Sequence, residues 1–504
     1  MKHSLPLLLL SATLALAGFG TSVRIDHSGP ADICYWPAIA LGPGTESSRP
    51  VYVAFQNSTS GFYSRIKFQK STDGGRTWLP TDVLVRRGAP CAYDPDITTD
   101  SDGSVYVVYE NVYPDTAGVD VAHILCTRST DGGATWSTPA RVDDESRGGI
   151  GLIRIAADSA GNLFVAWNQL PGGLSHVFTS VSTDKGVTWS PRVCVDNDTL
   201  TREVVHPEVF VQPGTNHYLV AATARRWIGD RRIPCAYLYR STDRGQTFEP
   251  GVQLDTFNWY AGTPHVVADR DHVVCDYFGR GQSDGDSIIA EARTFYMQAD
   301  SWGSPVRVTN LDSLQELYHS GTLALSGDGR VHTALMVQDT AVLHYGTYYA
   351  SSSDHGVSWS DIEIVHQDTT EADFYPDIVV DMAGHAYVVW SHGGGDSKIW
   401  FSTNNPAAIA EVPSQPTGRT KAHVITDHDG IEVEYQLPAV VHVRATLHDA
   451  IGRRVGMLDA GEQSAGLHQL SWNRGQEGRK LSAGAYFVHL DMGTEQARLK
   501  AVLR

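Results

Sequence analysis

Short runs of alternating apolar and polar residues recur along most of the chain and predict β-strands rather than helices. In one clear unit these runs cover residues 96–99, 105–109, 123–128 and 140–143. A turn with the sequence Ser-Thr-Asp-Gly-Gly-Ala-Thr-Trp lies between the third and fourth runs. Four short antiparallel strands in such a repeating unit are typical of one blade of a β-propeller.

This turn, an Asp box, occurs five times and punctuates the repeat. Its aspartate can accept backbone N–H groups, its glycine supplies a positive φ, and its aromatic residue can pack on the sheet, so we interpret it as structural. The spacing from Asp243 to Asp354 is about twice that between earlier copies, which predicts a degenerate unit with its turn near residues 297–303. The structural pairs are Asp73 and Trp78, Asp131 and Trp136, Asp184 and Trp189, Asp243 and Phe248, and Asp354 and Trp359.

Aligning the first strand of each unit gives seven units, so the fold class is an all-β, seven-bladed propeller, with six blades as the alternative. Residues 23–26 resemble the outer strands at 140–143 and 306–309, and we expect them to complete the seventh blade and cover its open edge. The polar or small residue that precedes an apolar position in each first strand should line one end of the central channel. These residues are Ala38, Asp96, Arg154, Glu208, His265, Thr322 and Asp377.

Both ends of the chain depart from the repeat. Residues 1–17 have a basic start, a short apolar run and a small-residue cleavage site, which predicts a secretory signal peptide, with a retained membrane anchor as the alternative. The propeller is then expected over residues 18–413. Beyond it, residues 414–504 predict a compact Ig-like β-sandwich, with strands at 430–436, 441–449, 468–473, 485–490 and 497–503.

Charge and cysteine usage narrow the range of partners. A formal net charge of -18 argues against a nucleic-acid partner, because such binding rests on clustered Lys and Arg. The six cysteines form no CxxC pair, so the sequence indicates no metal site and no cofactor. Calcium remains open at the acidic turns 100–103 and 284–286, although tight hairpins explain these turns as well.

Candidate chemistry is expected at the end of the channel where the first strands begin, called here the mouth. Asp96, Glu208 and Asp377 are the candidate catalytic carboxylates, and mutual pairing within the ring is the structural alternative. The candidate substrate-binding residues form two groups, one in the ring and one in an arginine-rich loop that would suit an acidic glycan. They are Arg154, His265 and Tyr375 in the first group, and Arg225, Arg226 and Trp227 in the second.

The Asp boxes make residues 30–410 resemble the sialidase or neuraminidase-like (BNR-repeat) superfamily, which includes exo-sialidases, other glycosidases and non-catalytic propellers. For a true sialidase the resemblance implies six blades, an arginine triad, an Asp acid/base and a Tyr nucleophile assisted by Glu. The first candidates for these roles would be Arg154, Glu208 and Tyr375. The Arg-Ile-Pro motif at 232–234 stands before the fourth Asp box rather than the first, so we do not carry the triad across.

The segments 447–455, 481–488 and 500–503 resemble the Ig-like C-terminal sorting domains of type IX secretion substrates, and also the flagellar-hook (FlgD-like) Ig domain. The resemblance implies export to the medium or the outer cell surface, with the export machinery as a partner and no transmembrane segment after signal removal. The expected function is recognition of an extracellular carbohydrate or glycoconjugate at the mouth. Hydrolysis by a sialidase-like glycosidase, an exo-α-sialidase proper, and a non-catalytic adhesion or scaffold propeller all remain open.

Overall fold

The computed structural model divides the chain into two compact units, residues 1–410 and 411–504, which are treated separately below. No helix among the described residues is long and apolar enough to cross a bilayer. The predicted signal peptide, residues 1–17, and the acidic turn at 284–286 lie outside the described residues. The structure describes residues 18–409 and 422–503, except for residues 30, 60–62, 86–90, 115–117, 145–149, 197–202, 229–230, 257–259, 281–287, 310–314, 340–343, 369, 395, 427–429, 438–440, 450–452, 464–465, 474–480, 483 and 493–494.

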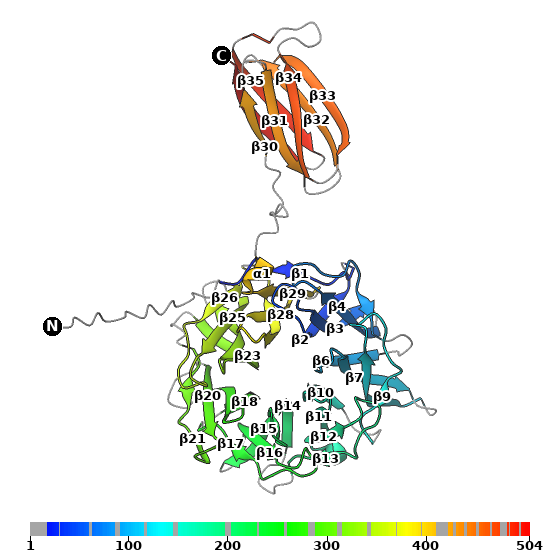
Figure 1. Cartoon of the computed structure of the whole chain (residues 1–504), viewed down its shortest axis with the longest axis vertical. Coiled ribbons are helices and arrows are strands. Elements are labelled where there is room, and N and C mark those ends of the chain that lie inside the picture. The colour runs from blue at the N-terminus through cyan, green and yellow to red at the C-terminus, as the bar shows by residue number, and fades with distance from the viewer. Residues whose placement is uncertain are drawn as a thin grey trace, which may run out of the picture. The chain divides into compact units, whose positions relative to one another are not determined.

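The first unit is an all-β propeller, as predicted. Its described residues form seven antiparallel sheets, and the first strands of neighbouring sheets lie beside one another all the way around the ring (Figure 1). Six sheets use consecutive strands, and the fifth of these carries one extra short strand. In order, they are β2 (Ile33–Leu41), β3 (Val51–Thr59), β4 (Tyr63–Ser71) and β5 (Val83–Leu84); β6 (Cys91–Thr99), β7 (Val105–Pro114), β8 (Asp120–Ser129) and β9 (Ala140–Arg141); β10 (Ile150–Ala157), β11 (Leu163–Gln169), β12 (His176–Ser182) and β13 (Val193–Cys194); β14 (Glu203–Val211), β15 (Tyr218–Ile228), β16 (Arg231–Ser241) and β17 (Val252–Gln253); β18 (Tyr260–Ala268), β19 (His272–Arg280), β20 (Ile289–Tyr296), β21 (Ser301–Trp302) and β22 (Val306–Arg307); and β23 (Gln315–Leu325), β24 (Val331–Asp339), β25 (His344–Ser352) and β26 (Glu363–His366).

The seventh sheet joins the two ends of the propeller. Strands β27 (Asp373–Val380), β28 (Ala386–His392) and β29 (Lys398–Thr403) are completed by β1 (Val23–Arg24), which pairs with β29. Ile25 N–H then donates to the Ile399 carbonyl at 2.9 Å, and Ile399 N–H donates to the Asp26 carboxylate at 2.9 Å. The prediction that residues 23–26 close the ring is therefore confirmed.

The Asp boxes connect neighbouring blades. In the first box, Asp73 accepts the backbone N–H of Thr77 at 2.8 Å and the Thr77 hydroxyl at 2.6 Å, and the other four boxes repeat these bonds. The aromatic residue reaches the preceding blade: Trp136 packs edge-on against Phe68 with ring centroids 5.3 Å apart. This confirms the structural role inferred from the repeat.

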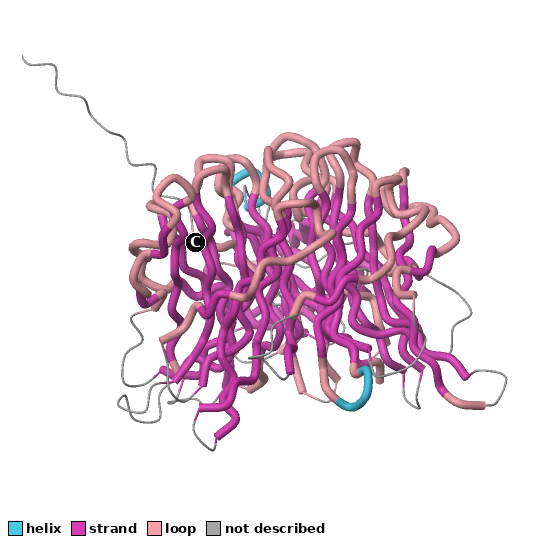
Figure 2. Tube along the Cα trace, turned by 90° about the horizontal axis from the view of Figure 1, so that it is seen from below, coloured by secondary structure: helices cyan, strands magenta, loops and turns pink. Residues whose placement is uncertain are grey.

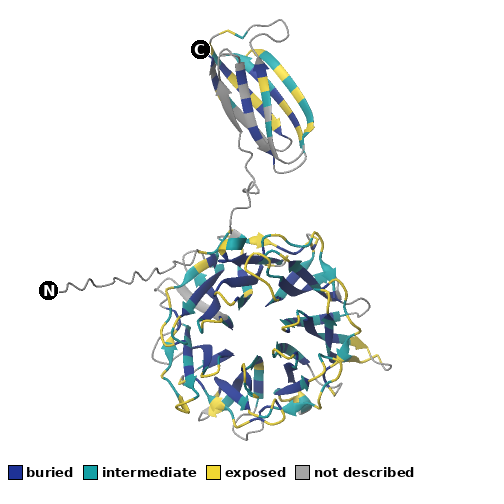
Figure 3. Ribbon diagram, in the orientation of Figure 1, coloured by how far each residue is buried: buried dark blue, intermediate teal, exposed yellow. Residues whose placement is uncertain are grey.

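The strands run between two rims of loops, with the short helices η1 (Pro171–Gly173) and α1 (Pro406–Ile409) at opposite rims (Figure 2). The Asp boxes lie at one rim, where the third strand of a blade meets the start of its second strand. The mouth lies at the other rim, where the first strands begin. Most residues of the strands around the channel are buried (Figure 3).

The second unit is a sandwich of two sheets around one apolar core. One sheet has the order β30 (Ala422–Thr426), β31 (Gly430–Leu437), β34 (Gly466–Asn473), and the other has the order β33 (Arg454–Gln463), β32 (Val441–Asp449), β35 (Gly484–Met492), β36 (Glu495–Leu503). All five predicted strands are present. Strands β30 and β33 were not predicted. β33 carries two glycines and an aspartate, and its residues alternate poorly between buried and exposed positions.

Candidate functional site

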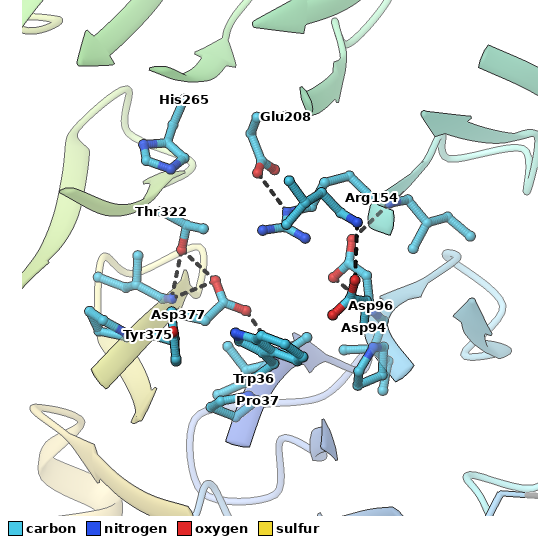
Figure 4. A pocket seen from close by; sticks show the side chains of 18 of the residues that line it. Trp36, Pro37, Asp94, Asp96, Arg154, Glu208, His265, Thr322, Tyr375 and Asp377 are labelled. Atoms are coloured by element: carbon cyan, nitrogen blue, oxygen red, sulfur yellow. Dashed lines mark hydrogen bonds and ion pairs between the residues drawn. The ribbon is translucent and has the colours of Figure 1, made fainter. Parts of the chain in front are cut away.

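A cavity of about 300 Å³ lies at the mouth of the channel (Figure 4). All seven ring residues predicted from the first strands line this cavity, and Tyr375 lines it too. The sequence pattern therefore placed the ring correctly, while the roles of its members in catalysis or binding stay predictions. The other lining residues are mainly their neighbours in the same strands, including Trp36, Asp94, Leu152, His206 and Thr263.

A bulge in each first strand aims these residues into the channel. The register of the first pair of strands shifts between Tyr93 and Asp96 in the second blade, and equivalent shifts occur in the other blades. The bulge places a residue with positive φ two positions before the ring residue, and in five of the six described cases the residue between them is a proline. Non-glycine residues in this region are uncommon and each stores some strain. They are Trp36, Asp94, Leu152, His206, Thr263 and Tyr375, with φ values of 49°, 49°, 52°, 57°, 37° and 52°.

Two of the ring carboxylates also connect blades. Asp96 accepts the backbone N–H of Ile155, in the next blade, at 2.7 Å, and Asp377 accepts that of Ile39 at 2.9 Å across the ring closure. The Thr322 hydroxyl donates to Asp377. Both aspartates thus have a structural part in the ring, and each still borders the cavity.

Arg154 and Glu208 form the ion pair of the site. Arg154 Nε donates to Glu208 Oε2 at 2.9 Å, and Arg154 Nη1 donates to the Ile153 carbonyl at 2.9 Å. Burial lowers the pKa of Arg154, but the charges of Glu208 and Asp96 outweigh burial and raise it overall. The guanidinium is therefore a permanent positive charge among carboxylates.

Asp96 has the most perturbed carboxyl group among the ring residues. Burial, with Glu208 and Asp377 nearby, raises the pKa of Asp96 to about 7 against the opposing charge of Arg154. Burial likewise raises the pKa of Asp377. A carboxylic acid that holds its proton near neutral pH is the group required of a general acid.

His265 faces the cavity from the fifth blade and is tied to Asp276 behind it. Its Nδ1 lies 2.9 Å from the Asp276 carboxylate, and both side chains are almost fully shielded from solvent. Burial lowers the pKa of His265, but Asp276 outweighs burial and raises it. His265 thus lies on the other side of Glu208 from Arg154, and Asp276 favours its protonated form.

Aromatic side chains form the wall opposite Arg154 and Glu208. Trp36 and Tyr375 lie with ring centroids 5.8 Å apart, and Tyr375 is 45% exposed (Figure 4). Trp36 was not singled out from the sequence, although the x-Pro pair that begins most of the first strands marks its position. The cavity consequently has an aromatic side and a polar side.

The arginine-rich segment differs from its prediction. It is a continuation of β15 and β16 rather than a loop, because Arg225 pairs with Pro234 and Trp227 with Arg232 across the hairpin. Arg225 and Arg232 both bind Glu203, the first at 2.7 Å, and Arg226 donates to Gln253 at 2.8 Å. Arg225, Arg226 and Trp227 do not line the cavity, and Trp227 is 51% exposed.

The arrangement implied by a true sialidase is not assembled in the lining. Among the described residues, Arg154 is the one arginine that borders the cavity. Tyr375 packs on Trp36, whereas Glu208 binds Arg154.

The acidic turn at 100–103 is a hairpin held by Asp100, which accepts the N–H of Ser104 at 2.9 Å and the Tyr106 hydroxyl at 2.7 Å.

Both parts of the chain match known domain families. Residues 63–273 match the family model of the BNR repeat-like domain, and residues 421–495 match that of the FlgD Ig-like domain. The resemblance of the Asp-box repeats to the BNR-repeat superfamily and that of the tail to the FlgD-like Ig domain are thereby confirmed. No match was found among curated proteins.

Several solved structures are similar to the chain. A Dyadobacter fermentans protein of unknown function shares 15% identity, with 77% of this chain and 99% of that chain covered and a TM-score of 0.46. The Penicillium chrysogenum α-L-arabinanase bound to arabinobiose shares 17% identity, with 61% of this chain and 92% of that chain covered and a TM-score of 0.42. The Trypanosoma rangeli sialidase bound to the inhibitor DANA shares 10% identity, with 95% of this chain and 89% of that chain covered and a TM-score of 0.43.

Proposed function

We propose that the protein recognises an extracellular glycan in the cavity at the mouth. The observation that supports this most directly is the two-sided lining, with Trp36 and Tyr375 on one wall and Arg154 and Glu208 on the other. A sugar presents an apolar C–H face and a rim of hydroxyl groups, and a concave site with apolar walls and a few convergent polar groups suits it. A cavity of about 300 Å³ has room for one or two sugar units.

The preferred glycan in this proposal is neutral. The lining holds four carboxyl groups, Asp94, Asp96, Glu208 and Asp377, against Arg154 and His265. Arg154 is already engaged by Glu208, and His265 by Asp276. An anionic sugar would meet uncompensated carboxylates, so the acidic glycan suggested by the arginine-rich hairpin is not part of this proposal.

A glycan array followed by calorimetry on the full chain tests the proposal. Binding of a neutral oligosaccharide should weaken at least tenfold in Trp36→Asn, because asparagine tolerates the positive φ but removes the aromatic wall. Trp227→Asn, at an exposed position outside the cavity, is the matched control and should bind normally. Equal affinity of both variants, or binding of sialosides alone, would contradict the proposal.

Hydrolysis is a second candidate function, favoured by the raised pKa of Asp96. In this scheme Asp96 donates its proton to the glycosidic oxygen, and Glu208, whose carboxylate faces the same cavity, acts as the second carboxylate. Turnover of neutral fluorogenic glycosides should fall as the pH rises through about 7 and should be lost in Asp96→Asn. Binding without turnover on any glycoside would leave recognition as the function.

Export completes the proposal. The predicted signal peptide at residues 1–17 and the match of residues 421–495 to the FlgD Ig-like domain support secretion, with the tail as the sorting element. Expression of the full chain and of a chain ending at residue 413 in a type IX-competent host tests this. We expect the full chain in the medium or on the outer surface and the shortened chain in the periplasm.

A further inference from the structure

A second cluster of side chains lies at the rim of the Asp boxes, between the fifth and sixth blades. It consists of Asp269 and His272, from the β18–β19 turn, and His355, from the Asp box that follows β25. Their potential ligand atoms all lie within 4.8 Å of one another. The side chains are 25–30% exposed, so an ion can reach them from solvent.

The geometry points to a binding site for a single Zn²⁺ ion, held by Asp269, His272 and His355. Asp269 Oδ2 lies 3.0 Å from His355 Nε2 and 3.3 Å from His272 Nδ1. Ligand atoms in a tetrahedral zinc site, with bonds of 2.0–2.1 Å, are about 3.3 Å apart. The two imidazole rings lie next to each other, with centroids 3.9 Å apart.

The carboxylate is fixed before any ion binds. Asp269 Oδ1 accepts the backbone N–H groups of Asp271 and His272 at 2.8 and 2.7 Å, which orients the carboxylate and leaves Oδ2 toward the histidines. Two imidazoles and one carboxylate suit zinc better than calcium, which takes oxygen ligands.

The third blade carries a related contact between neighbouring blades. Lys185 occupies the same Asp-box position in the third blade as His355 does in the sixth, with φ values of 60° and 59°. The Lys185 ammonium forms an ion pair with Asp102 and also lies 3.6 Å from Asp100, which begins the β6–β7 turn of the preceding blade as Asp269 begins the β18–β19 turn. At the fifth and sixth blades His355 takes the position of this lysine, and His272 lies beside it in the turn of the preceding blade. An ion would restore the missing positive charge and join the two blades.

Two other His-containing clusters in the described residues have a simpler explanation. Asp196, near His176, and Asp373, near His366 and His392, are fully shielded and each accepts a backbone N–H of a third strand, from Val177 and Thr347. Asp143 makes the same bond to Ile124 beside a single histidine, so this is a recurring cap on the third strand. Asp269 instead accepts backbone N–H groups within its own turn, as Asp381 does beside His385 in the seventh blade, and only Asp269 is also met by a second histidine, His355, from the next blade.

Isothermal titration of the chelator-treated full chain with ZnCl₂ tests the site, with His355→Lys as the matched variant. Lysine at this position reproduces the Lys185 arrangement, so the variant should fold and should bind one Zn²⁺ fewer than the wild type. Zinc should raise the Tm of the wild type by about 2–4 °C and that of His355→Lys not at all. Co²⁺ bound to the wild type should show the intense visible absorption of tetrahedral coordination.

A second variant, His272→Gln, guards against a folding defect in the first and should also lose one equivalent of zinc. Equal zinc stoichiometry in wild type and both variants would overturn the inference. The site is independent of the cavity at the mouth, so neutral-glycan binding should be the same with and without zinc. Failure of the proposed function would therefore leave this test unaffected.

Discussion

Arg154 holds Glu208 through a single hydrogen-bonded ion pair at 2.9 Å, with side-chain exposures of 34% and 18%. The pair spans the third and fourth blades, and the same guanidinium offsets the charge of Asp96 from the second blade. Three blades therefore share one positive charge at the mouth. This arrangement couples the electrostatics of the cavity to the stability of the ring.

Replacing Arg154 should disturb the electrostatics of the cavity and lower the stability of the ring. In Arg154→Met, Glu208 loses its partner in a site that is only partly solvated, and we expect a loss of about 1–2 kcal/mol in unfolding free energy. Urea denaturation at pH 7 measures this. The double variant Arg154→Met/Glu208→Gln should recover about half of the loss, because the unpaired charge is gone; strictly additive effects would show that the pair contributes nothing.

The raised pKa of Asp96 predicts a pH dependence with a definite sign. The folded protein holds this proton up to about pH 7, whereas an unfolded aspartate releases it near pH 4, so stability falls as the pH rises between these values. Asp96→Asn removes the ionisable group and keeps an oxygen that can accept the Ile155 N–H. The urea midpoint of this variant should exceed that of the wild type at pH 8, and the advantage should shrink at pH 5.

The exposed carboxylate of Asp361, outside the cavity lining, provides the control for this experiment. Asp361→Asn should shift the urea midpoint equally little at both pH values. A constant difference between Asp96→Asn and the wild type across the range would mean that Asp96 is already ionised at pH 5.

The repeat explains why so much of the ring could be predicted from sequence. The Asp boxes fix the phase of each blade, so the position of Asp96 in its first strand also located Arg154, Glu208 and Asp377. The pairing of Arg154 with Glu208 rather than with Asp96 depends on side-chain conformation, which the repeat does not encode. The hairpin that carries Arg225 was missed as a strand because its polar residues interrupt the apolar pattern beyond the edge of the sheet.

The second glycine of an Asp box is expected to be intolerant of any side chain. A Cβ at Gly133, where φ is 87°, would lie 2.2 Å from the ring of Phe68 in the preceding blade. Gly214 has a φ of 70° but open space around it, so Gly214→Ala measures the cost of the backbone conformation alone, about 1 kcal/mol. Gly133→Ala adds a clash in a packed interface and should cost about 3 kcal/mol or more by thermal or urea denaturation. Similar losses in the two variants would show that Phe68 can move aside.

The ring closure depends on Asp26, because its buried carboxylate makes several hydrogen bonds. It accepts the Ile399 N–H from β29 at 2.9 Å and pairs with Arg24 at 3.0 Å, and its side chain is fully shielded. Burial raises the pKa of Asp26, but the hydrogen bonds from Arg24 and Ser28 outweigh burial and lower it. Its contribution is therefore present above the unfolded pKa near 4 and is lost as the pH falls through the folded value.

Asp26→Ala should cost about 2–3 kcal/mol at pH 7, since Ile399 N–H loses its acceptor inside the sheet. Asp26→Asn keeps that acceptor and loses only the charge, so it should cost roughly half as much. The loosened edge of β29 should also promote self-association, measurable by light scattering during heating. If Asp26→Ala self-associates no more than the wild type and is as stable as Asp26→Asn, the closure depends on the β1–β29 backbone pairing alone.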